Sequence, residues 1–185
     1  MVETVSDFEL IRSFLAGDQA AFNKLAARYQ SKIYWHARRM TGDHLDADDV
    51  MQEVLLTMYN KLHTFQFNSS LYTWVYRITA TRSINHLTRK KVRNFFSLDS
   101  DQARNLSTSE DIPEQIDVKD KMLKLDSLMQ KLPERQREVF ILRNFEMLSY
   151  EEISQITKKS VGSLKASYFH AVAKIADWMK EAENG

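Results

Sequence analysis

Apolar residues recur along most of the chain at intervals of three and four, which places them on one face of an α-helix. Gly (4) and Pro (2) are scarce, so the chain has few of the residues that strands and tight turns need. We therefore predict an all-α fold, with two small helical domains joined by a flexible linker. The predicted helices cover residues 8–15, 22–40, 46–62 and 71–93 in the first half, and 118–132, 133–145, 149–157 and 160–179 in the second.

The predicted linker is a stretch without helical periodicity, residues 94–117, which is rich in Ser, Asp, Asn and Gln. We predict a first domain over 1–95, a linker over 96–117 and a second domain over 118–185. The acids of the linker either keep it solvated or imitate a nucleic acid in a basic channel, and the sequence leaves both interpretations open.

The 185 residues are 43% hydrophobic and 28% charged, the balance of a globular protein. Cysteine is absent, which excludes disulfides, thiolate metal sites and a cysteine nucleophile. We find no signal peptide and no apolar run of about 20 residues, so we expect a cytoplasmic protein that does not enter a membrane. Without a glycine-rich phosphate loop or a convincing acid–base pair, we expect no enzyme, no catalytic residue and no cofactor.

A metal site can be sought among four neighbouring residues with suitable side chains. The glycine of a calcium-binding loop is missing from this stretch, so we expect no metal there. The four are His44, Asp46, Asp48 and Asp49.

Charge is unevenly distributed, although the net charge is only +1. No Asp or Glu occurs between Glu53 and Asp99, which indicates a surface that attracts polyanions. The cations of this stretch are Lys61, Arg77, Arg82, Arg89, Lys90, Lys91 and Arg93.

The last two predicted helices have the layout of a helix-turn-helix unit. Ser149 and Glu152 form a capping-box pattern at the start of a short helix, Lys158 and Lys159 make the turn, and Ser160 precedes a longer helix. One face of that longer helix is apolar, whereas its first turns are otherwise small or polar, which lets a helix enter the major groove of DNA. An ordinary three-helix bundle would show a similar pattern, so the pattern alone leaves both interpretations open.

The order of residues favours DNA binding. From Leu132 the chain reads LPERQREVFILRNFEMLSYEEISQITKKSVGSLKASYFHAVAKI, which resembles region four of the bacterial sigma-70 family, in particular its extracytoplasmic-function (ECF) group. The first half contains GDQAAFNKLAARYQSKIYWHARRMTGDHLDADDVMQEV and FQFNSSLYTWVYRI, which resemble region two of the same family. The two resemblances together cover nearly the whole chain in the order that this group shows.

The resemblance implies a transcription initiation factor. Such a protein binds core RNA polymerase at the β′ clamp helices and the β flap, recognises the −10 and −35 promoter elements, and assists opening of the DNA. It therefore meets promoter DNA as duplex and as single strand, and an anti-sigma factor or another recruiting factor is a further partner that the resemblance suggests. The alternative is a free-standing helix-turn-helix regulator that does not act as a polymerase subunit.

The resemblance also assigns roles to individual positions. The acidic patch that would meet the β′ clamp helices consists of Asp48, Asp49, Gln52 and Glu53. Contacts to the −10 element would come from Phe67, Asn68, Ser69, Ser70, Tyr72, Tyr76, Arg77, Thr81, Arg82, Asn85, Arg89 and Lys90. Contacts to the −35 element would come from Ser149, Lys158, Lys159, Ser160, Gly162, Ser163, Lys165, Ala166 and His170.

Several positions depart from the family pattern. Thr81 stands where the family often has Asn, which affects the −10 preference. The recognition helix lacks arginines that the family commonly carries, so its attraction to phosphate is reduced. We expect weak binding of the −35 element by this half alone, with polymerase or another factor supplying the rest. The positions without arginine are Ser167, His170 and Val172. We expect Trp74 to belong to the core rather than to contact DNA.

Overall fold

The computed structural model describes residues 5–97 and 116–184, and within these ranges every regular element is helical. This confirms the all-α prediction. None of the described helices combines the length and apolarity needed to cross a bilayer. The elements are α1 (Asp7–Leu15), α2 (Gln19–Thr41), α3 (His44–Lys61), the 3-10 turn η1 (Leu62–Thr64), α4 (Leu71–Ser97), α5 (Ile116–Lys131), α6 (Glu134–Asn144), α7 (Tyr150–Thr157) and α8 (Val161–Asn184).

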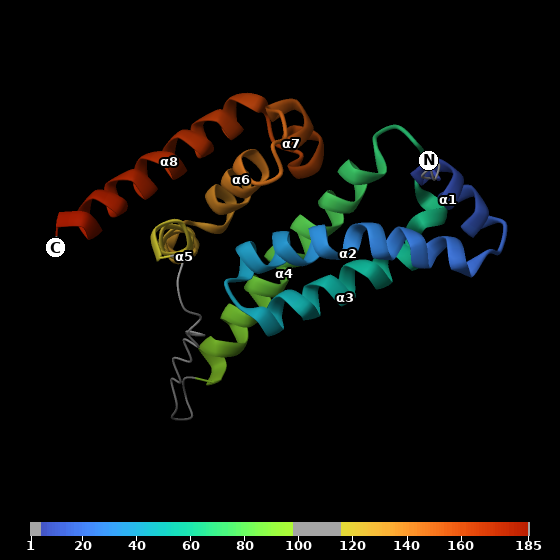
Figure 1. Ribbon diagram of the computed structural model, residues 1–185, viewed down its shortest axis with the longest axis horizontal. Coiled ribbons are helices and arrows are strands. Elements are labelled where there is room, and N and C mark those ends of the chain that lie inside the picture. The colour runs from blue at the N-terminus through green and yellow to red at the C-terminus, as the bar shows by residue number, and fades with distance from the viewer. Residues whose placement is uncertain (1–4, 98–115, 185) are drawn as a thin grey trace.

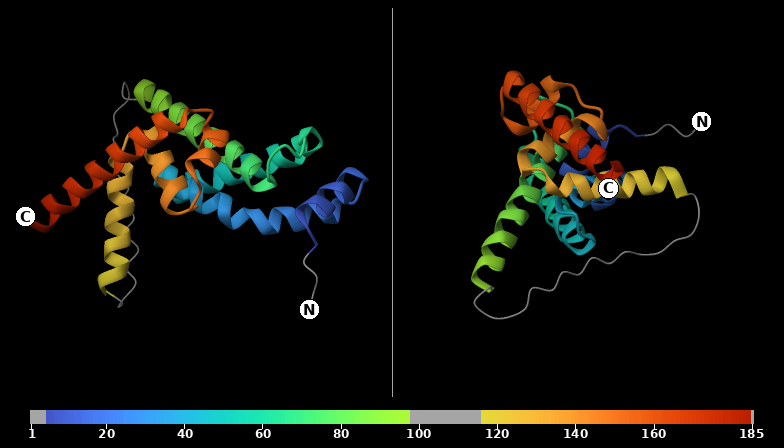
Figure 2. Two further views of the ribbon diagram at one scale, coloured as in Figure 1. Left: turned by 90° about the horizontal axis from the view of Figure 1, so that it is seen from above. Right: turned by 90° about the vertical axis from the view of Figure 1, so that its left-hand side faces the viewer.

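The helices form two bundles that lie against each other (Figure 1). The N-terminal bundle contains α1 to α4, with α2 packed against α1, α3 and α4. The C-terminal bundle contains α5 to α8, and its α6 and α7 rest on α2 and α4 of the first. Figure 2 shows that the first turns of α5 extend away from the other helices.

Local capping fixes where the helices begin and end. The side chain of Asp43 accepts a hydrogen bond from the N–H of Asp46 at 2.9 Å, so α3 starts at His44, earlier than we predicted. Gly42 ends α2 in the left-handed region at φ 77°, where glycine is favoured. Pro133 precedes the first residue of α6 instead of lying within the helix.

The predicted linker boundaries need correction. The helix that we expected to stop at Arg93 continues to Ser97, and α5 begins at Ile116, inside the stretch predicted to be irregular. Residues 98–115 lie outside the described residues. The division into functional domains remains a prediction.

Apolar burial joins the two bundles. One core lies within the N-terminal bundle, where Val50 and Val54 of α3 are fully buried. A second core packs Tyr76 and Ala80 of α4 against residues of α6, α7 and α8. A third core packs Met40 of α2 against α5, α6 and α8. Met122, near the start of α5, is 42% exposed.

Candidate nucleic-acid and polymerase interface

The helix-turn-helix unit forms as the sequence predicts. Ser149 Oγ accepts the N–H of Glu152 at 3.2 Å, and the Glu152 carboxylate accepts the N–H of Ser149 at 2.8 Å. The N–H and the hydroxyl of Ser149, which both donate to this carboxylate at 2.8 Å, hold the pKa of Glu152 below its usual range. Lys158, at φ 60°, donates its N–H to the carbonyl of Ser154 and turns the chain towards α8.

Helix α8, the predicted recognition helix, presents its predicted DNA face to solvent. Leu164, Ala171 and Ile175 are buried against the C-terminal bundle. The structure also leaves Phe169 69% exposed, on the side of Lys165 one turn further along. We did not single out Phe169 from the sequence, since an aromatic residue in an amphipathic helix usually belongs to the core. The predicted contacts of α8 that are exposed are Gly162, Ser163, Lys165, Ala166 and His170.

The loop between η1 and α4 is held in an unusual conformation. Phe67 adopts φ 56°, a region that costs a non-glycine residue about 1–2 kcal/mol. Its ring contacts those of Phe8 and Phe65, with centroids 5.0 and 4.8 Å away. Trp74 packs on the N-terminal core, as we expected, and also lines a cavity beside the loop. A cavity of about 390 Å³ beside the loop is lined by Thr64, Phe65, Gln66, Asn68, Ser69, Trp74, Arg77, Gln155 and Lys158.

The C-terminal bundle covers part of the α4 surface expected to meet DNA. The hydroxyls of Tyr72 and Tyr76 both donate to the Glu146 carboxylate, and Arg77 donates to the carbonyl of Gln155 at 2.6 Å. Tyr76 is only 1% exposed. Burial and Glu146 raise the pKa of both tyrosines, that of Tyr72 to about 12, so both remain donors at neutral pH. In this conformation, Tyr76 is inaccessible to a nucleobase.

A second set of polar contacts joins the bundles at the C-terminal end of α2. The last carbonyls of a helix have no partner within it. Gln130 donates to the carbonyl of Arg39 at 2.9 Å, and Arg137 donates to that of Met40. A Cβ atom on Gly42 would lie 2.6 Å from Cδ of Gln130, so a larger residue there would displace the Gln130 side chain from this position. Residues 91 and 97 positions apart form these bonds, which no local sequence pattern predicts.

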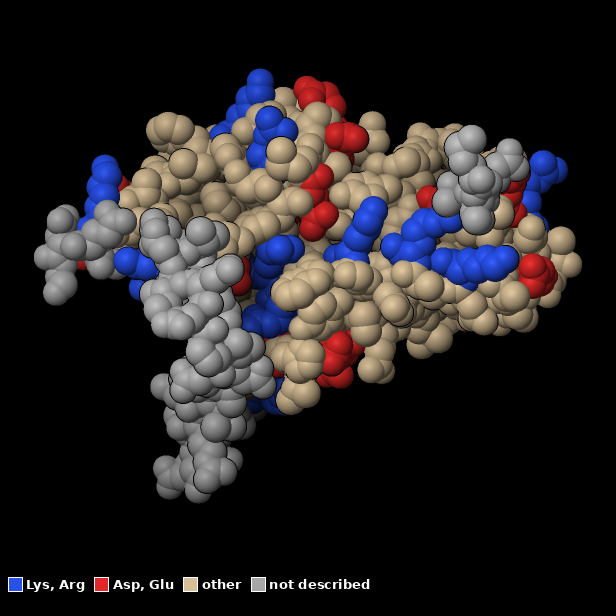
Figure 3. All heavy atoms as spheres, in the orientation of Figure 1, with Lys and Arg blue, Asp and Glu red and all other residues tan. Residues whose placement is uncertain are grey.

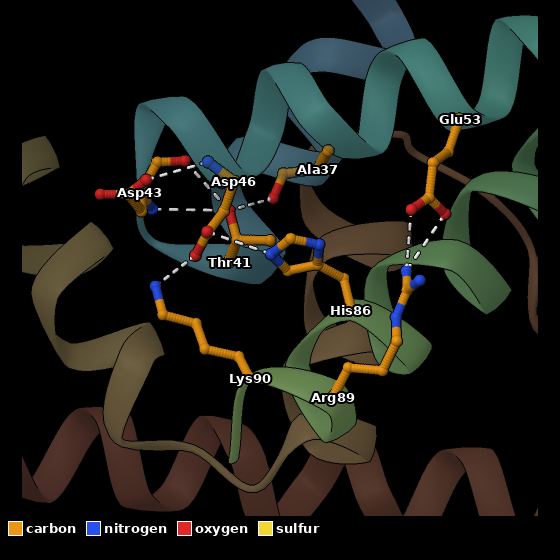
Figure 4. Close-up of polar contacts among 8 residues, drawn as sticks. All are labelled: Ala37, Thr41, Asp43, Asp46, Glu53, His86, Arg89 and Lys90. Carbon is orange, nitrogen blue, oxygen red and sulfur yellow. Dashed lines mark hydrogen bonds and ion pairs between the residues drawn. The ribbon is translucent and has the colours of Figure 1, made fainter. Parts of the chain in front are cut away.

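Helix α3 packs against the basic helix α4, and Glu53 of the acidic patch points towards Arg89 (Figure 4). Arg89 donates to both oxygens of Glu53, at 2.9 and 3.2 Å, and Arg82 lies 3.7 Å from the same carboxylate. Lys90 pairs with Asp46, which we had considered only as a metal ligand. Cations that we expected to track phosphate are therefore held by acids of α3. Exposed at this surface are Asp49, Gln52, Thr81 and Asn85, and Asp48 is half-buried.

Asp46 is the buried centre of its own ion-pair cluster. Nε2 of His86 lies 3.0 Å from one of its oxygens, and Lys90 donates to the other. Burial alone would raise the pKa of Asp46, but the Lys90 and His86 side chains outweigh burial and hold it below the usual range.

A row of cations lies on α2, and we did not single it out from the sequence. Lys and Arg side chains lie in a line over α2 on the face shown in Figure 3. The signal was available, because no Asp or Glu occurs between Asp18 and Asp43. Trp35, 52% exposed, lies in the same line. The cations at helical spacing are Lys24, Arg28, Lys32 and Arg39.

Comparison with known proteins gives matches along most of the chain. The family model of sigma-70 region 2 matches residues 25–93, and that of sigma-70 region 4 matches residues 122–175. The RNA polymerase sigma-H factor of Pseudomonas aeruginosa is 32% identical over 178 residues, covering 92% of each chain. The ECF RNA polymerase sigma-E factor of Escherichia coli is 33% identical, covering 92% of this chain and 93% of that protein.

Two solved structures share the fold. CnrH, in complex with the cytosolic domain of CnrY, superposes with a TM-score of 0.69 at 21% identity, covering 95% of this chain and 97% of that one. The sigma factor RpoE from Bartonella quintana, in complex with the anti-sigma factor NepR, gives 0.69 at 20% identity, covering 86% and 96%. The family models and the relatives show that the chain belongs to the sigma-70 family of RNA polymerase sigma factors, in its ECF group.

Proposed function

We propose that this sigma factor directs core RNA polymerase to promoters by reading the −10 element with the N-terminal bundle and the −35 element with the C-terminal bundle. The observation that carries the proposal is that one chain combines an exposed helix-turn-helix face with a separate acidic patch and a polar loop cavity. We propose that the chain carries out no catalytic step itself. We also propose that it acts in the cytoplasm, beside the polymerase.

At the −35 element, the first turns of α8 enter the major groove. Ser163, Lys165 and Ala166 are exposed there, and their small or slender side chains allow close approach to base edges. Ala166 suits the methyl group of thymine. The N–H groups at the start of α7, beside Ser149, face a phosphate.

At the −10 element, the loop cavity takes an extruded base of the non-template strand. Asn68 and Ser69 offer hydrogen-bonding groups, and Phe67, 44% exposed, offers a ring for stacking. Gln155 and Lys158 of the C-terminal bundle also line this cavity, so we propose that the two bundles separate when promoter DNA binds. The cations of α2 then add contacts to phosphate.

The acidic patch, Asp48, Asp49, Gln52 and Glu53, is the proposed contact for the β′ clamp helices, and the C-terminal bundle is the proposed contact for the β flap. Opposite charges on two such surfaces favour rapid and specific association. Two proteins with this fold were solved in complex with CnrY and with the anti-sigma factor NepR, which supports an inhibitory partner for this chain as well.

The test is run-off transcription with core polymerase on a randomised promoter library, together with capture of polymerase by the full chain. We expect selected promoters to share two short motifs at a fixed spacing. Asp49→Lys should abolish polymerase capture and leave duplex binding intact, whereas Lys165→Ala should do the reverse. Duplex binding without polymerase capture by the unaltered chain would instead identify a free-standing regulator.

A further inference from the structure

We propose that Glu53 controls when the cations of α4 reach DNA. In the free chain its carboxylate holds Arg82 and Arg89, and when polymerase binds that carboxylate the two arginines are released to phosphate. This inference rests on the proposed function, in which Glu53 faces polymerase and both arginines face promoter DNA. Glu53 is then a positioning residue for DNA binding as well as a polymerase contact.

One carboxylate of α3 serves two guanidinium groups of α4. Arg89 donates from Nη2 to both oxygens of Glu53, at 2.9 and 3.2 Å (Figure 4). Nη1 of Arg82 lies 3.7 Å from Oε2, and its Nη2 donates to Thr57 at 3.1 Å. The two arginines are seven residues apart, two helical turns, and so lie on the same side of α4. A change at Glu53 therefore affects both at once.

These contacts can exchange because they are exposed to solvent. The side chains of Glu53, Arg82 and Arg89 are 34%, 36% and 59% exposed. Ion pairs in such surroundings contribute little net stability and are weakened further by salt. A competing cation from polymerase can replace an arginine at Glu53 at low cost, provided that the arginine gains another anion.

The neighbouring ion pairs of Asp46 behave differently. The side chains of Asp46 and His86 are only 11% and 13% exposed, and Asp46 is also held through its N–H by Asp43. Removing one partner of a buried charge leaves the other without compensation, which is strongly destabilising. The Asp46 contacts therefore keep α3 and α4 together while those of Glu53 exchange.

The space needed for exchange is present. A groove of about 620 Å³ lies between α3 and α4, with acids on one wall and cations on the other. Leu56, 63% exposed, offers an apolar contact beside Glu53. Polymerase entering from the acidic side and DNA from the basic side would then favour each other's binding, as thermodynamic linkage requires. The residues that line the groove are Asp49, Gln52, Glu53, Leu56, His86, Arg89, Lys90 and Arg93.

The experiment measures DNA binding by the full chain without polymerase. The probe is a fluorescent single-stranded DNA of mixed sequence, followed by anisotropy over a range of salt concentrations. Glu53→Gln should raise affinity about 3- to 10-fold at low salt. Each released arginine should also steepen the slope of log affinity against log salt by about 0.7, hence by about 1.4 in all. A purely structural role for Glu53 would leave that slope unchanged.

The matched control is Asp49→Asn. It removes the same charge one turn earlier on α3, and Asp49 takes part in none of the ion pairs formed between described residues. We expect Asp49→Asn to raise the affinity for single-stranded DNA by less than about twofold and to leave the salt slope unchanged. An equal gain in both variants would mean that net charge alone is responsible, and would overturn the proposal.

A double-mutant cycle isolates the contact itself. In a background of Arg82→Gln with Arg89→Gln, Glu53→Gln should no longer raise affinity, because no cation remains to be released. An undiminished gain in that background would also overturn the proposal.

Polymerase capture, measured in parallel, separates this inference from the proposed function. Loss of capture by Glu53→Gln without a gain in DNA affinity would disprove the exchange and leave the polymerase surface standing. Normal capture by both Glu53→Gln and Asp49→Asn would disprove the polymerase surface, and with it the release step. The expected result is loss of capture together with a steeper salt slope.

Discussion

In the proposed function, DNA binding by the α4 surface and DNA binding by the α8 surface are limited by different properties. The α4 surface is rich in cations, but the C-terminal bundle covers Tyr76, and Glu53 holds two of the arginines. The α8 surface is open, but Lys165 is the only Lys or Arg between Val161 and His170. Access therefore limits the first surface, and charge limits the second. Variants that alter access and variants that alter charge should have separable effects.

The largest effect should come from Arg137, whose side chain forms a polar contact between the two bundles. Arg137 is buried and donates to the carbonyl of Met40, which ties α6 to the end of α2, and to the carbonyls of Gln130 and Leu132 within its own bundle. Arg137→Met leaves those carbonyls without a donor, and should separate the bundles and lower the free energy of unfolding by about 3 kcal/mol.

Energy transfer between two dyes can follow this separation, because the chain has no cysteine to compete for labelling. Dyes at Asn23→Cys and Ala176→Cys, both at exposed positions, would report on α2 and α8. The matched control is Arg135→Met, two residues earlier on α6 and exposed. Unchanged transfer in Arg137→Met would show that apolar contacts alone hold the bundles together.

The contacts between the two bundles differ from the features that a local sequence pattern can predict. The capping box at Ser149 and the buried line through Val50 and Val54 follow from residues a few positions apart, and the structure confirms them. The bond from Arg137 to Met40 joins residues 97 positions apart, so only the packing of the bundles creates it. Likewise, the resemblance assigned Glu53 to polymerase and Arg89 to DNA, because nothing local shows that α3 and α4 bring them together.

The two bundles should also differ in how pH affects them. Burial raises the pKa of Glu138 in α6 from 4.5 to about 7, although Arg135 and Lys159 partly oppose it. The folded chain thus keeps a proton that the unfolded chain releases, so the contribution of Glu138 to stability is full below pH 4.5 and is lost as pH rises through 7. The loss is at most about 3 kcal/mol. Asp46 in the N-terminal bundle has a lowered pKa, so its contribution is lost only in acid.

Urea unfolding at pH 5.5 and pH 8, followed by circular dichroism, tests this difference. Glu138→Gln should remove most of the decline in stability, and the exposed control Glu151→Gln should leave it in place. The same decline in Glu138→Gln as in the unaltered chain would assign the pH dependence to another group.

Weakening the hydrogen bonds that Glu146 accepts should expose the α4 surface with a smaller effect than Arg137→Met. Its carboxylate accepts from Tyr72 and Tyr76, and hydrogen bonds to a charged group contribute about 1.5–3 kcal/mol. Glu146→Gln keeps the shape and one acceptor, so we expect a gain of about tenfold in affinity for single-stranded −10 DNA, measured by anisotropy. Glu151→Gln, which removes an equal charge from an exposed position, should give less. Equal gains would show that charge, not cover, limits the α4 surface.

DNA binding by α8 is limited by its low positive charge. Adding one cation to this helix should therefore raise its affinity for DNA, whereas uncovering α4 should not. His170 is exposed on α8, at a position where the resemblance to the family led us to expect Arg. His170→Arg should raise affinity for promoter duplex several-fold and steepen the salt slope by about 0.9, the value for one added phosphate contact on duplex DNA. Ala176→Arg adds the same charge six residues further on, on another side of the helix. It should change neither the affinity for promoter duplex nor the salt slope. If Glu146→Gln strengthened duplex binding as much as His170→Arg, cover would limit both surfaces and the distinction between them would fail.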